Sequence, residues 1–484
     1  MPDLPAALRG GVAKSDITTD DPGVVIHDPL YAKALVLDDG ATQLAIIAMD
    51  VVAIGGICDV SDDFLPELRA RVQRELGIPG SHVLVNASHT HPPGKMLCEH
   101  DQQVERTFDA VRRAQEALEP VRVGAGKGHE PRFAVNRTVR LRDGRGWTIR
   151  HANPCPPDGE IAELGPVDPE IGLLRIDRLD GRPLAVVYNF ACHPLLGVPG
   201  GKITANFPGF ASQVIEDSLD AMALFLQGAG GDMTEVLYKD VTRARDARPV
   251  GAMLGLSVLN ALQGISTEAA TLSVVNQPVA LPRRTDLDDR IAALEAEQAE
   301  LLASLRFTSL NFRTFLPLYL KHVLNPEHPA DYSYRYLHEE ATADETLRAL
   351  DAENQGNLDK YLSNIAAMER MARIQDRIAT YRRHDAINRE AGEPTVQTEV
   401  QGLRIGECVI VTSPAEVCAE VGLNVKRASP YEHTFLAAFS NGYIHYGPPA
   451  ADYLAGDYEV TECFLAPEWQ ALFEQAARDV IARL

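Results

Sequence analysis

The chain has 484 residues, of which 45% are hydrophobic and 24% are charged, and 46 lysines and arginines stand against 68 aspartates and glutamates. This composition predicts a folded protein, because disordered chains combine low hydrophobicity with dense charge. The formal net charge of −22 argues against nucleic-acid binding, since an acidic surface repels the phosphate backbone.

The sequence also argues against a membrane-spanning protein. Its longest apolar run, Leu44–Ile54, is interrupted by Asp50 and is shorter than the roughly 18 residues that a transmembrane helix needs. The N-terminal stretch carries charges such as Arg9 and Lys14 where a signal peptide would be apolar. The 7 cysteines are widely spaced without a CxxC pair, which is typical of free thiols. We therefore expect a cytoplasmic protein without a transmembrane segment.

Short apolar runs separated by turn residues predict an α/β fold with mixed β-sheets flanked by helices. Several of these runs are almost continuously apolar, as in strands that are buried on both faces. We expect the first part of the core in residues 1–275 and the second part in 396–484. The predicted strands are Leu44–Met49, His82–Asn86, Leu184–Phe190, Met222–Leu226, Cys408–Thr412 and Thr434–Phe439.

A mainly helical insertion or cap is expected between these parts, in residues 276–395 and chiefly in 285–390. Thr285-Asp-Leu-Asp288 has the form of a capping box at the start of a helix that runs to about Leu305. A second helix is predicted from Leu358 to Tyr381, after an aromatic segment, 312–336. Its apolar stripe would comprise Leu358, Leu362, Ile365, Met368 and Ile378. Whether the insertion is a lid or a subunit interface, and hence whether the chain forms a homo-oligomer, stays open.

Side chains that are able to bind metal follow five of the predicted strands directly, at the position where α/β sheets gather their ligands. In chain order these residues are His89 and His91, His193, Asp232 and Thr234, Glu416, and Tyr443 and Tyr446. In an extended chain, His89 and His91 would face the same side. Glu416 is expected to open a helix over 417–426, where the helix dipole favours a carboxylate.

Zinc accepts histidine nitrogen and carboxylate oxygen, so two histidines from different strands and one glutamate suit a catalytic zinc site. The sequence contains no HExxH helix, Walker A loop or GxSxG elbow. Gly228-Ala-Gly-Gly231 and Gly200-Gly201 lack the spacing of phosphate-binding loops, and we interpret both as tight turns.

Short motifs in this order resemble the N-terminal catalytic domain of the neutral/alkaline, non-lysosomal ceramidase family, which hydrolyses the amide of N-acylsphingosine with one zinc ion. They are Gly11-Val-Ala-Lys-Ser-Asp-Ile-Thr18, Asn86-Ala-Ser-His-Thr-His91, Val135-Asn-Arg137, Asn189-Phe-Ala-Cys-His-Pro194, Gly231-Asp232, Ser413-Pro-Ala-Glu416, Ser440-Asn-Gly-Tyr-Ile-His-Tyr446 and Tyr458-Glu459.

The resemblance implies a role for each matching residue. The implied zinc ligands are His89, His193, Glu416 and Tyr446, with Tyr443 as the alternative tyrosine. The implied catalytic groups are His91, Arg137 and Tyr458, and Asp232 and Thr234 would position the substrate or a neighbouring side chain. The sequence departs from the family after Gly231-Asp232, where Met233, Thr234 and Glu235 replace a small residue, serine and proline.

We therefore expect a zinc-dependent hydrolase that cleaves an amide C–N bond with metal-activated water. Its substrate would be a small-molecule or lipid-like amide, an N-acyl compound or lactam rather than ceramide, because the altered loop weakens the inference to ceramide more than the inference to zinc. Two alternatives stay open. The same site could run a zinc-assisted ester hydrolysis or elimination, or the chain could be a non-catalytic, zinc-stabilised binding protein.

Overall fold

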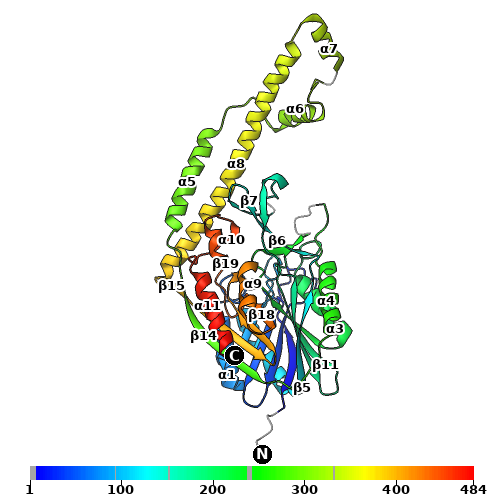
Figure 1. Ribbon diagram of the computed structural model, residues 1–484, viewed down its shortest axis with the longest axis vertical. Helices are drawn as coiled ribbons and strands as arrows, with labels where there is room; N and C mark the ends of the chain where they lie inside the picture. Colours follow the sequence, from blue (N-terminus) through cyan, green and yellow to red (C-terminus); the bar gives the residue numbers. More distant parts are fainter. Residues whose placement is uncertain (1–6, 93, 151–152, 237–241, 331–332) are drawn as a thin grey trace, which may run out of the picture. The chain divides into compact units, whose positions relative to one another are not determined.

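The computed structural model describes residues 7–92, 94–150, 153–236, 242–330 and 333–484 (Figure 1). The chain divides into two compact units. The first unit comprises Met1–Arg284 and Glu393–Leu484, and the second comprises Thr285–Gly392. Residues 276–284 belong to the first unit, since the strand Leu272–Pro282 pairs along its whole length with the strand Thr395–Ile405. The expected α/β class, with mixed sheets flanked by helices, is confirmed.

The larger sheet of the first unit has eight strands in the order β12-β11-β10-β5-β1-β2-β3-β4. The pairs β3–β4 and β11–β12 are parallel, and the other neighbours are antiparallel. The strands are β1 (Arg9–Asp16), β2 (Tyr31–Asp38), β3 (Gln43–Met49), β4 (Val83–Ala87), β5 (Glu119–His129), β10 (Glu170–Arg178), β11 (Pro183–Phe190) and β12 (Met222–Gln227).

A second sheet has the order β14-β15-β16-β18 and packs face to face on the first. Its strands are β14 (Leu272–Pro282), β15 (Thr395–Ile405), β16 (Cys408–Thr412) and β18 (His433–Ala437), of which β16 and β18 are parallel. Side chains from both inner faces, among them Leu35, Leu174 and Phe435, form one buried cluster. Burial on both faces explains why these strands read as continuous apolar runs.

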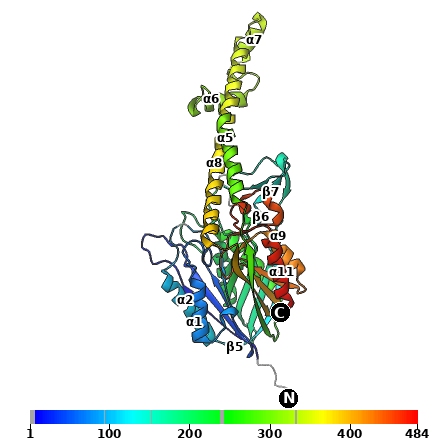
Figure 2. The same ribbon diagram turned by 90° about the vertical axis from the view of Figure 1, so that its left-hand side faces the viewer.

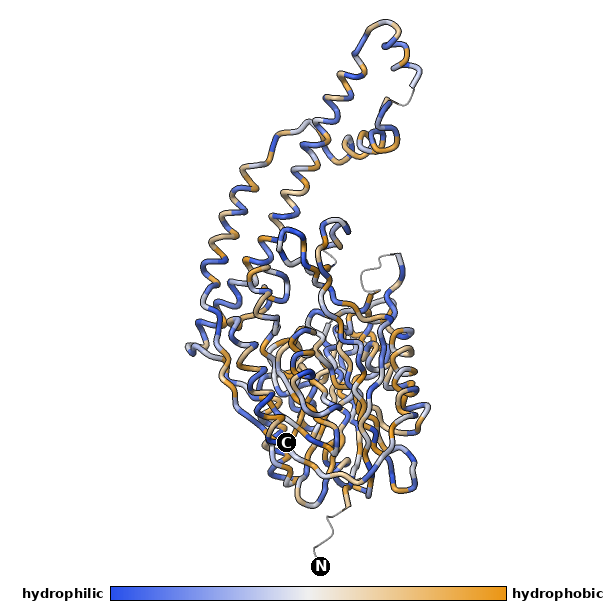
Figure 3. The backbone as a smooth tube through the Cα atoms, in the orientation of Figure 1, coloured by the Kyte–Doolittle hydropathy of each residue, from blue (hydrophilic) through white to orange (hydrophobic). Residues whose placement is uncertain are grey.

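Helices cover the two outer faces, so the unit is a four-layer sandwich, and the outer helices α1 and α2 lie opposite α9 and α11 in Figure 2. On the larger sheet, α1 (Phe64–Leu76) and α2 (His100–Glu116) lie over β1–β4, and α3 (Asn206–Leu219) and α4 (Arg248–Leu262) lie over β5 and β10–β12. On the smaller sheet lie α9 (Ala419–Ala428) and α11 (Trp469–Ala482). Hydrophobic residues gather along the strands (Figure 3).

Short strands and one short helix complete the part of the unit where the candidate site lies. They form the pairs β13 (Met233–Glu235) with β6 (Ala134–Asn136) and β17 (Glu416–Val417) with β19 (Tyr446–Gly447), the three-stranded sheet of β8 (Gly146–Thr148), β7 (Thr138–Leu141) and β9 (Ile161–Leu164), and the helix α10 (Tyr458–Thr461). The prediction that Glu416 opens a helix is wrong. Glu416 pairs in parallel with Tyr446, and the helix begins after Cys418.

The second unit is helical, as predicted. It comprises α5 (Leu287–Ser304), α6 (Phe312–Leu324), α7 (Ser333–Thr342) and α8 (Thr346–Ala391). The helices α5 and α8 lie side by side, and Arg370 forms two hydrogen bonds of 2.7 and 2.9 Å with the carboxylate of Glu297. Residues 331–332 of the predicted aromatic segment lie outside the described residues.

One detail predicted for this unit is wrong, and the predicted stripe of the second helix is only partly buried. The first helix is capped by Asp286 rather than Thr285, and the Asp286 side chain makes no capping hydrogen bond but pairs with Arg290. In α8, Leu358 and Ile378 are buried, whereas Leu362 and Met368 are 39% and 50% exposed. A helix that packs along only part of its surface leaves much of its apolar stripe in water. None of the helices in the described ranges is long and apolar enough to cross a membrane.

Asp50 yields a prediction about stability. Its carboxylate, just after β3, accepts a hydrogen bond from the backbone N–H of Tyr31, and burial raises the pKa to about 6 from the ordinary 3.8. Because the folded chain holds this proton more tightly than the unfolded chain, the carboxyl lowers stability progressively as the pH rises from about 4 to 6. Asp50→Asn keeps an acceptor for Tyr31 without this penalty.

We expect urea unfolding to show the Asn variant gaining stability over the wild type between pH 4 and pH 8, by up to about 3 kcal/mol. Below pH 4 the two proteins should differ by a constant amount, because the wild-type carboxyl is then protonated in both states. A stability difference that does not change with pH would contradict the raised pKa.

Candidate metal centre

Buried amide side chains bring several strand ends together. In β4, Asn86 donates from Nδ2 to the carbonyl of Ala438 (2.6 Å), beyond β18, and to the hydroxyl of Ser440 (2.9 Å), and it accepts from the N–H of Gln227 (2.8 Å) at the end of β12. Because β4 and β12 are the opposite edge strands of the larger sheet, this side chain joins both edges to the second sheet. The chain segments that follow β4, β12 and β18 therefore begin close to one another.

His89 follows β4 and is almost completely buried. Its φ of 64° places it in the left-handed region, so the prediction that His89 and His91 share a side because the chain is extended is wrong. Hydrogen bonds hold this turn, from the backbone N–H to the carbonyl of Val51 (2.9 Å) and from Nδ1 to that of Val52 (2.6 Å). A carbonyl only accepts, so Nδ1 carries the proton and Nε2 presents a lone pair.

His193, which follows β11, has the same tautomer for the same reason. Its Nδ1 lies 2.5 Å from the carbonyl oxygen of Gly230 and 3.2 Å from that of Met233, which leaves Nε2 with a lone pair. Burial lowers the pKa of the imidazole to about 4, so the ring is neutral at neutral pH. This is the form of histidine that binds a metal.

The carboxylate of Glu416 lies close to Nε2 of both histidines. Its Oε2 lies 3.0 Å from Nε2 of His193 and 3.4 Å from Nε2 of His89, and its Oε1 accepts a 2.5 Å hydrogen bond from the hydroxyl of Tyr443. Burial by itself would raise the pKa of this carboxyl, but His89 and His193 outweigh burial and hold the pKa well below its usual range. The arrangement of an ionised carboxylate and two imidazole nitrogens is a candidate cation site.

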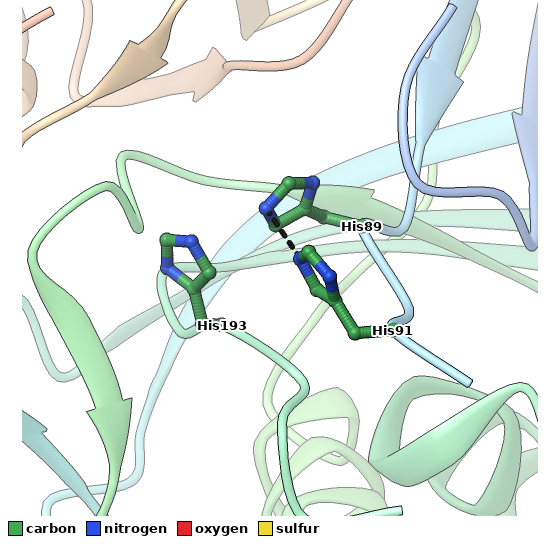
Figure 4. A group of neighbouring side chains, drawn as sticks. All are labelled: His89, His91 and His193. Carbon is green, nitrogen blue, oxygen red and sulfur yellow. Dashed lines mark hydrogen bonds between the residues drawn. The ribbon is translucent and has the colours of Figure 1, made fainter. Parts of the chain in front are cut away.

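His91 lies beside this group, with its Nε2 2.9 Å from Nε2 of His89, and the metal-binding nitrogens of His89, His91 and His193 all lie within 4.8 Å of one another. Figure 4 shows the three rings turned toward a common point. Unlike the other two, His91 is exposed. It is therefore the histidine that a substrate would reach first.

Tyr446 completes the group from β19. Its hydroxyl lies 3.4 Å from Nε2 of His193 and 3.0 Å from Nη2 of Arg137. Of the two tyrosines proposed from the sequence, Tyr446 faces the histidine nitrogen, whereas Tyr443 bonds the outer oxygen of Glu416. Tyr446 thus lies beside the candidate ligand nitrogen, and Tyr443 holds the Glu416 carboxylate.

Arg137 is buried and lies next to Tyr446. It pairs with Glu459 (Nε to Oε1, 2.8 Å) and donates from Nη2 to the carbonyl of Gly231 (2.8 Å), while Thr138 and Thr148 donate to the second carboxylate oxygen of Glu459. A buried guanidinium needs such complete pairing. Arg137 therefore positions Tyr446 and the glycine loop.

Tyr458 stands at the edge of the group. Its ring centroid lies 5.5 Å from that of Tyr446, and the Arg150 guanidinium lies 3.7 Å from the centroid of the Tyr458 ring. Burial raises the pKa of the phenol to about 12. The hydroxyl therefore stays protonated at neutral pH and is available as a hydrogen-bond donor.

Asp232 and Thr234 brace the loop instead of joining the histidines. The two Asp232 oxygens accept from the N–H of Ala419, at the start of α9, and from Asn136, both at 2.7 Å. The Thr234 hydroxyl points to Glu235, whose carboxylate accepts from two backbone N–H groups of the segment after His193. Burial raises the pKa of both Asp232 and Glu235 to about 7.

The turn expected at 228–231 is confirmed, since the backbone N–H of Met233 bonds to the carbonyl of Gly230 (3.0 Å), but these glycines also serve a second purpose. None of Gly228, Gly230 and Gly231 has a positive φ, whereas Gly200 and Gly201 do and form the expected turn. A Cβ on Gly231 would lie 2.4 Å from the carbonyl oxygen of Glu416. Glycine is needed here because two backbones touch. Residue types alone did not predict this contact. They also did not predict the structural roles of Asn86 and Glu459, although both residues lie in the motifs given above.

Comparison with known proteins identifies the fold of the chain. No family model matches the sequence, and a search of the curated proteins finds no relative. Among solved structures, a ceramidase in complex with C2 matches with a TM-score of 0.62 and 16% identity over 99% of this chain and 76% of its own. The neutral ceramidase from Pseudomonas aeruginosa matches with a TM-score of 0.61 and 17% identity, over 100% and 75% of the two chains.

The chain has the neutral ceramidase fold. The resemblance inferred from the short motifs is thereby confirmed at the level of the fold, even though identity is too low for a sequence search to find it. The match extends over nearly the whole of this chain.

Metal content is the direct test of the candidate centre. We expect purified wild-type protein supplied with zinc to bind one ion per chain, and His193→Ala to bind none, because the variant loses a buried ligand. His100→Ala is the matched control, since His100 pairs on the surface with Glu67 (3.0 Å). Elemental analysis of the three proteins, with circular dichroism to confirm folding, decides the matter. Equal zinc in a folded His193→Ala variant would refute the site.

The Gly231 contact gives a separate prediction. In Gly231→Ala the methyl group would meet the Glu416 backbone, so we expect a loss of about 1–3 kcal/mol in the free energy of unfolding and weaker zinc binding. The control is Gly356→Ala in α8, where a Cβ has no neighbour within 4 Å and alanine favours the helix. Chemical denaturation and zinc titration measure both effects. Unchanged zinc affinity in Gly231→Ala would show that this contact does not support the centre.

Proposed function

We propose that the protein is a zinc-dependent hydrolase that cleaves the C–N bond of an amide. One observation carries the proposal. Nε2 of two buried histidines, His89 and His193, lies within 3.4 Å of one oxygen of Glu416, and the Tyr446 hydroxyl lies beside them. Each imidazole is fixed in its metal-binding tautomer by a backbone carbonyl.

The donor set suits zinc, which takes nitrogen and oxygen ligands and leaves a position open in catalytic sites. His89, His193, Glu416 and Tyr446 would hold the ion. Bound there, zinc would supply a Lewis acid for the substrate carbonyl and make hydroxide available near neutral pH. The neutral imidazole of His193 and the ionised carboxylate of Glu416 are already in the protonation states that binding requires.

His91 and Tyr458 are the groups we assign to the chemistry itself. His91 is exposed at the edge of the ligand group, so it takes the proton of the attacking water at a ring nitrogen and returns it to the leaving amine. Tyr458 keeps its proton at neutral pH and donates a hydrogen bond to the oxygen that becomes negative in the tetrahedral intermediate.

Arg137, Asp232 and Thr234 have supporting roles in this proposal. Arg137 holds Tyr446 and the carbonyl of Gly231, and its buried charge is matched by Glu459. Asp232 holds the start of α9, and Thr234 lies in the short strand that pairs with β6. We therefore assign these side chains to positioning rather than to bond breaking.

For the substrate we propose an N-acyl compound or lactam. The structural neighbours are ceramidases, which supports an amide, and the altered residues 233–235 distinguish this chain from that family's motif. We also propose a cytoplasmic location, because each of the 7 cysteines lies among the described residues as a free thiol.

The reaction type is tested by incubating the zinc-loaded protein with short N-acyl amines and lactams in water labelled with heavy oxygen. Hydrolysis places solvent oxygen in the acyl product, and mass spectrometry detects it. Turnover without labelled oxygen would mean an elimination. Zinc and ligand binding without any turnover would mean a binding protein. Either result would overturn the proposal.

Tyr458→Phe separates the donor from the ligands. Losing one hydrogen-bond donor to the developing oxyanion costs about 3–4 kcal/mol, so we expect kcat to fall roughly 100- to 1,000-fold with unchanged zinc content. Tyr431→Phe, a tyrosine whose ring lies 5.0 Å from the Arg404 guanidinium away from the site, is the control. A Tyr458→Phe enzyme with wild-type kcat would remove Tyr458 from the mechanism.

A further inference from the structure

The helix α6 of the second unit presents an apolar face to solvent. Six large apolar side chains on it recur at spacings of three, four or one residues, which places them on one side of a helix. Their exposed fractions lie between 37% and 81%, and they are Phe312, Leu316, Tyr319, Leu320, Val323 and Leu324. Phe307, just before the helix, is 92% exposed. Such a continuous apolar patch on a soluble surface marks a site of interaction.

One edge of this apolar face is already packed against α8, and the packed Phe315 ring also stacks on Tyr319 with centroids 5.3 Å apart. Phe315 is 7% exposed, and its ring stacks on Tyr361 of α8 with centroids 4.5 Å apart. Asn311 caps the helix by accepting hydrogen bonds from the N–H groups of Arg313 and Thr314. The helix, which is labelled α6 in Figure 1, is therefore formed and anchored through Phe315, while the six side chains named above remain exposed.

The charged residues around α6 indicate which kind of surface this apolar face would contact. Residues 301–326 contain no aspartate or glutamate, but they contain Arg306, Arg313 and Lys321, in a chain whose net charge is −22. Arg306 and Arg313 are exposed. An apolar stripe flanked by cations is the pattern of a helix that lies in the interface of a membrane with anionic lipids.

We propose that α6 docks this protein on an anionic lipid surface. Thirteen residues of helix span about 20 Å, too short to cross a bilayer, so the helix would lie along the interface with its apolar face in the acyl-chain boundary. A second copy of the chain is a poorer partner, because two such segments would bring like charges together. The proposal is independent of the chemistry assigned to the metal centre.

Vesicle flotation with the full-length protein tests the proposal. We expect binding to vesicles of phosphatidylcholine with phosphatidylserine, much weaker binding to phosphatidylcholine alone, and release at high salt. Arg306→Gln/Arg313→Gln should weaken binding about 30-fold, since each cation contributes about 1 kcal/mol near an anionic surface. Leu320→Asp/Leu324→Asp should abolish it. Leu179→Asp, at a side chain that is 59% exposed in the first unit, is the control and should bind like the wild type.

All substituted side chains are exposed, so circular dichroism and urea unfolding should match the wild type and separate lost binding from lost folding. Wild-type binding by the Leu320→Asp/Leu324→Asp variant, or no binding of the wild type to anionic vesicles, would overturn the proposal. A concentration-dependent dimer in sedimentation equilibrium that the same variant abolishes would also overturn it, by assigning the face to a second copy.

Discussion

The candidate metal centre depends on one buried amide. Asn86 uses both Nδ2 hydrogens and its Oδ1 to join β4, the end of β12 and the segment after β18. An unpaired buried amide is costly, so full satisfaction of this side chain selects the arrangement in which the two edges of the larger sheet meet the second sheet. Asn189 acts in the same way, donating from Nδ2 to the carbonyls of Leu226 and Leu436.

From that junction, backbone groups rather than packing orient the candidate ligands. The carbonyls of Val52 and Gly230 each fix one imidazole, and the pairing of Glu416 with Tyr446 places a carboxylate and a phenol on neighbouring short strands. Backbone atoms that are held in a sheet or a close turn move little. The centre is thus preorganised before any ion binds, which reduces the cost of assembling it.

The buried charges next to the centre are also fully paired. Arg137 and Glu459 neutralise each other, and the donors of two threonines occupy the second oxygen of Glu459. Removing either member would leave an uncompensated buried charge. By contrast, the helical unit carries its charges on the surface, in pairs such as Arg370 with Glu297, and it exposes an apolar face on α6. The two units therefore differ in where their apolar and charged side chains lie.

Local patterns in the sequence were enough to predict the α/β class, the strand Cys408–Thr412 and the helical insertion, because alternation and apolar runs report burial directly. They could not supply the left-handed turn at His89, the strand pairing of Glu416 with Tyr446 or the contact of Gly231 with the Glu416 backbone. Each of these arises between segments that are far apart in the chain. Only the tertiary structure decides which backbone carbonyl fixes a histidine and which backbones touch, since that depends on how the two sheets pack.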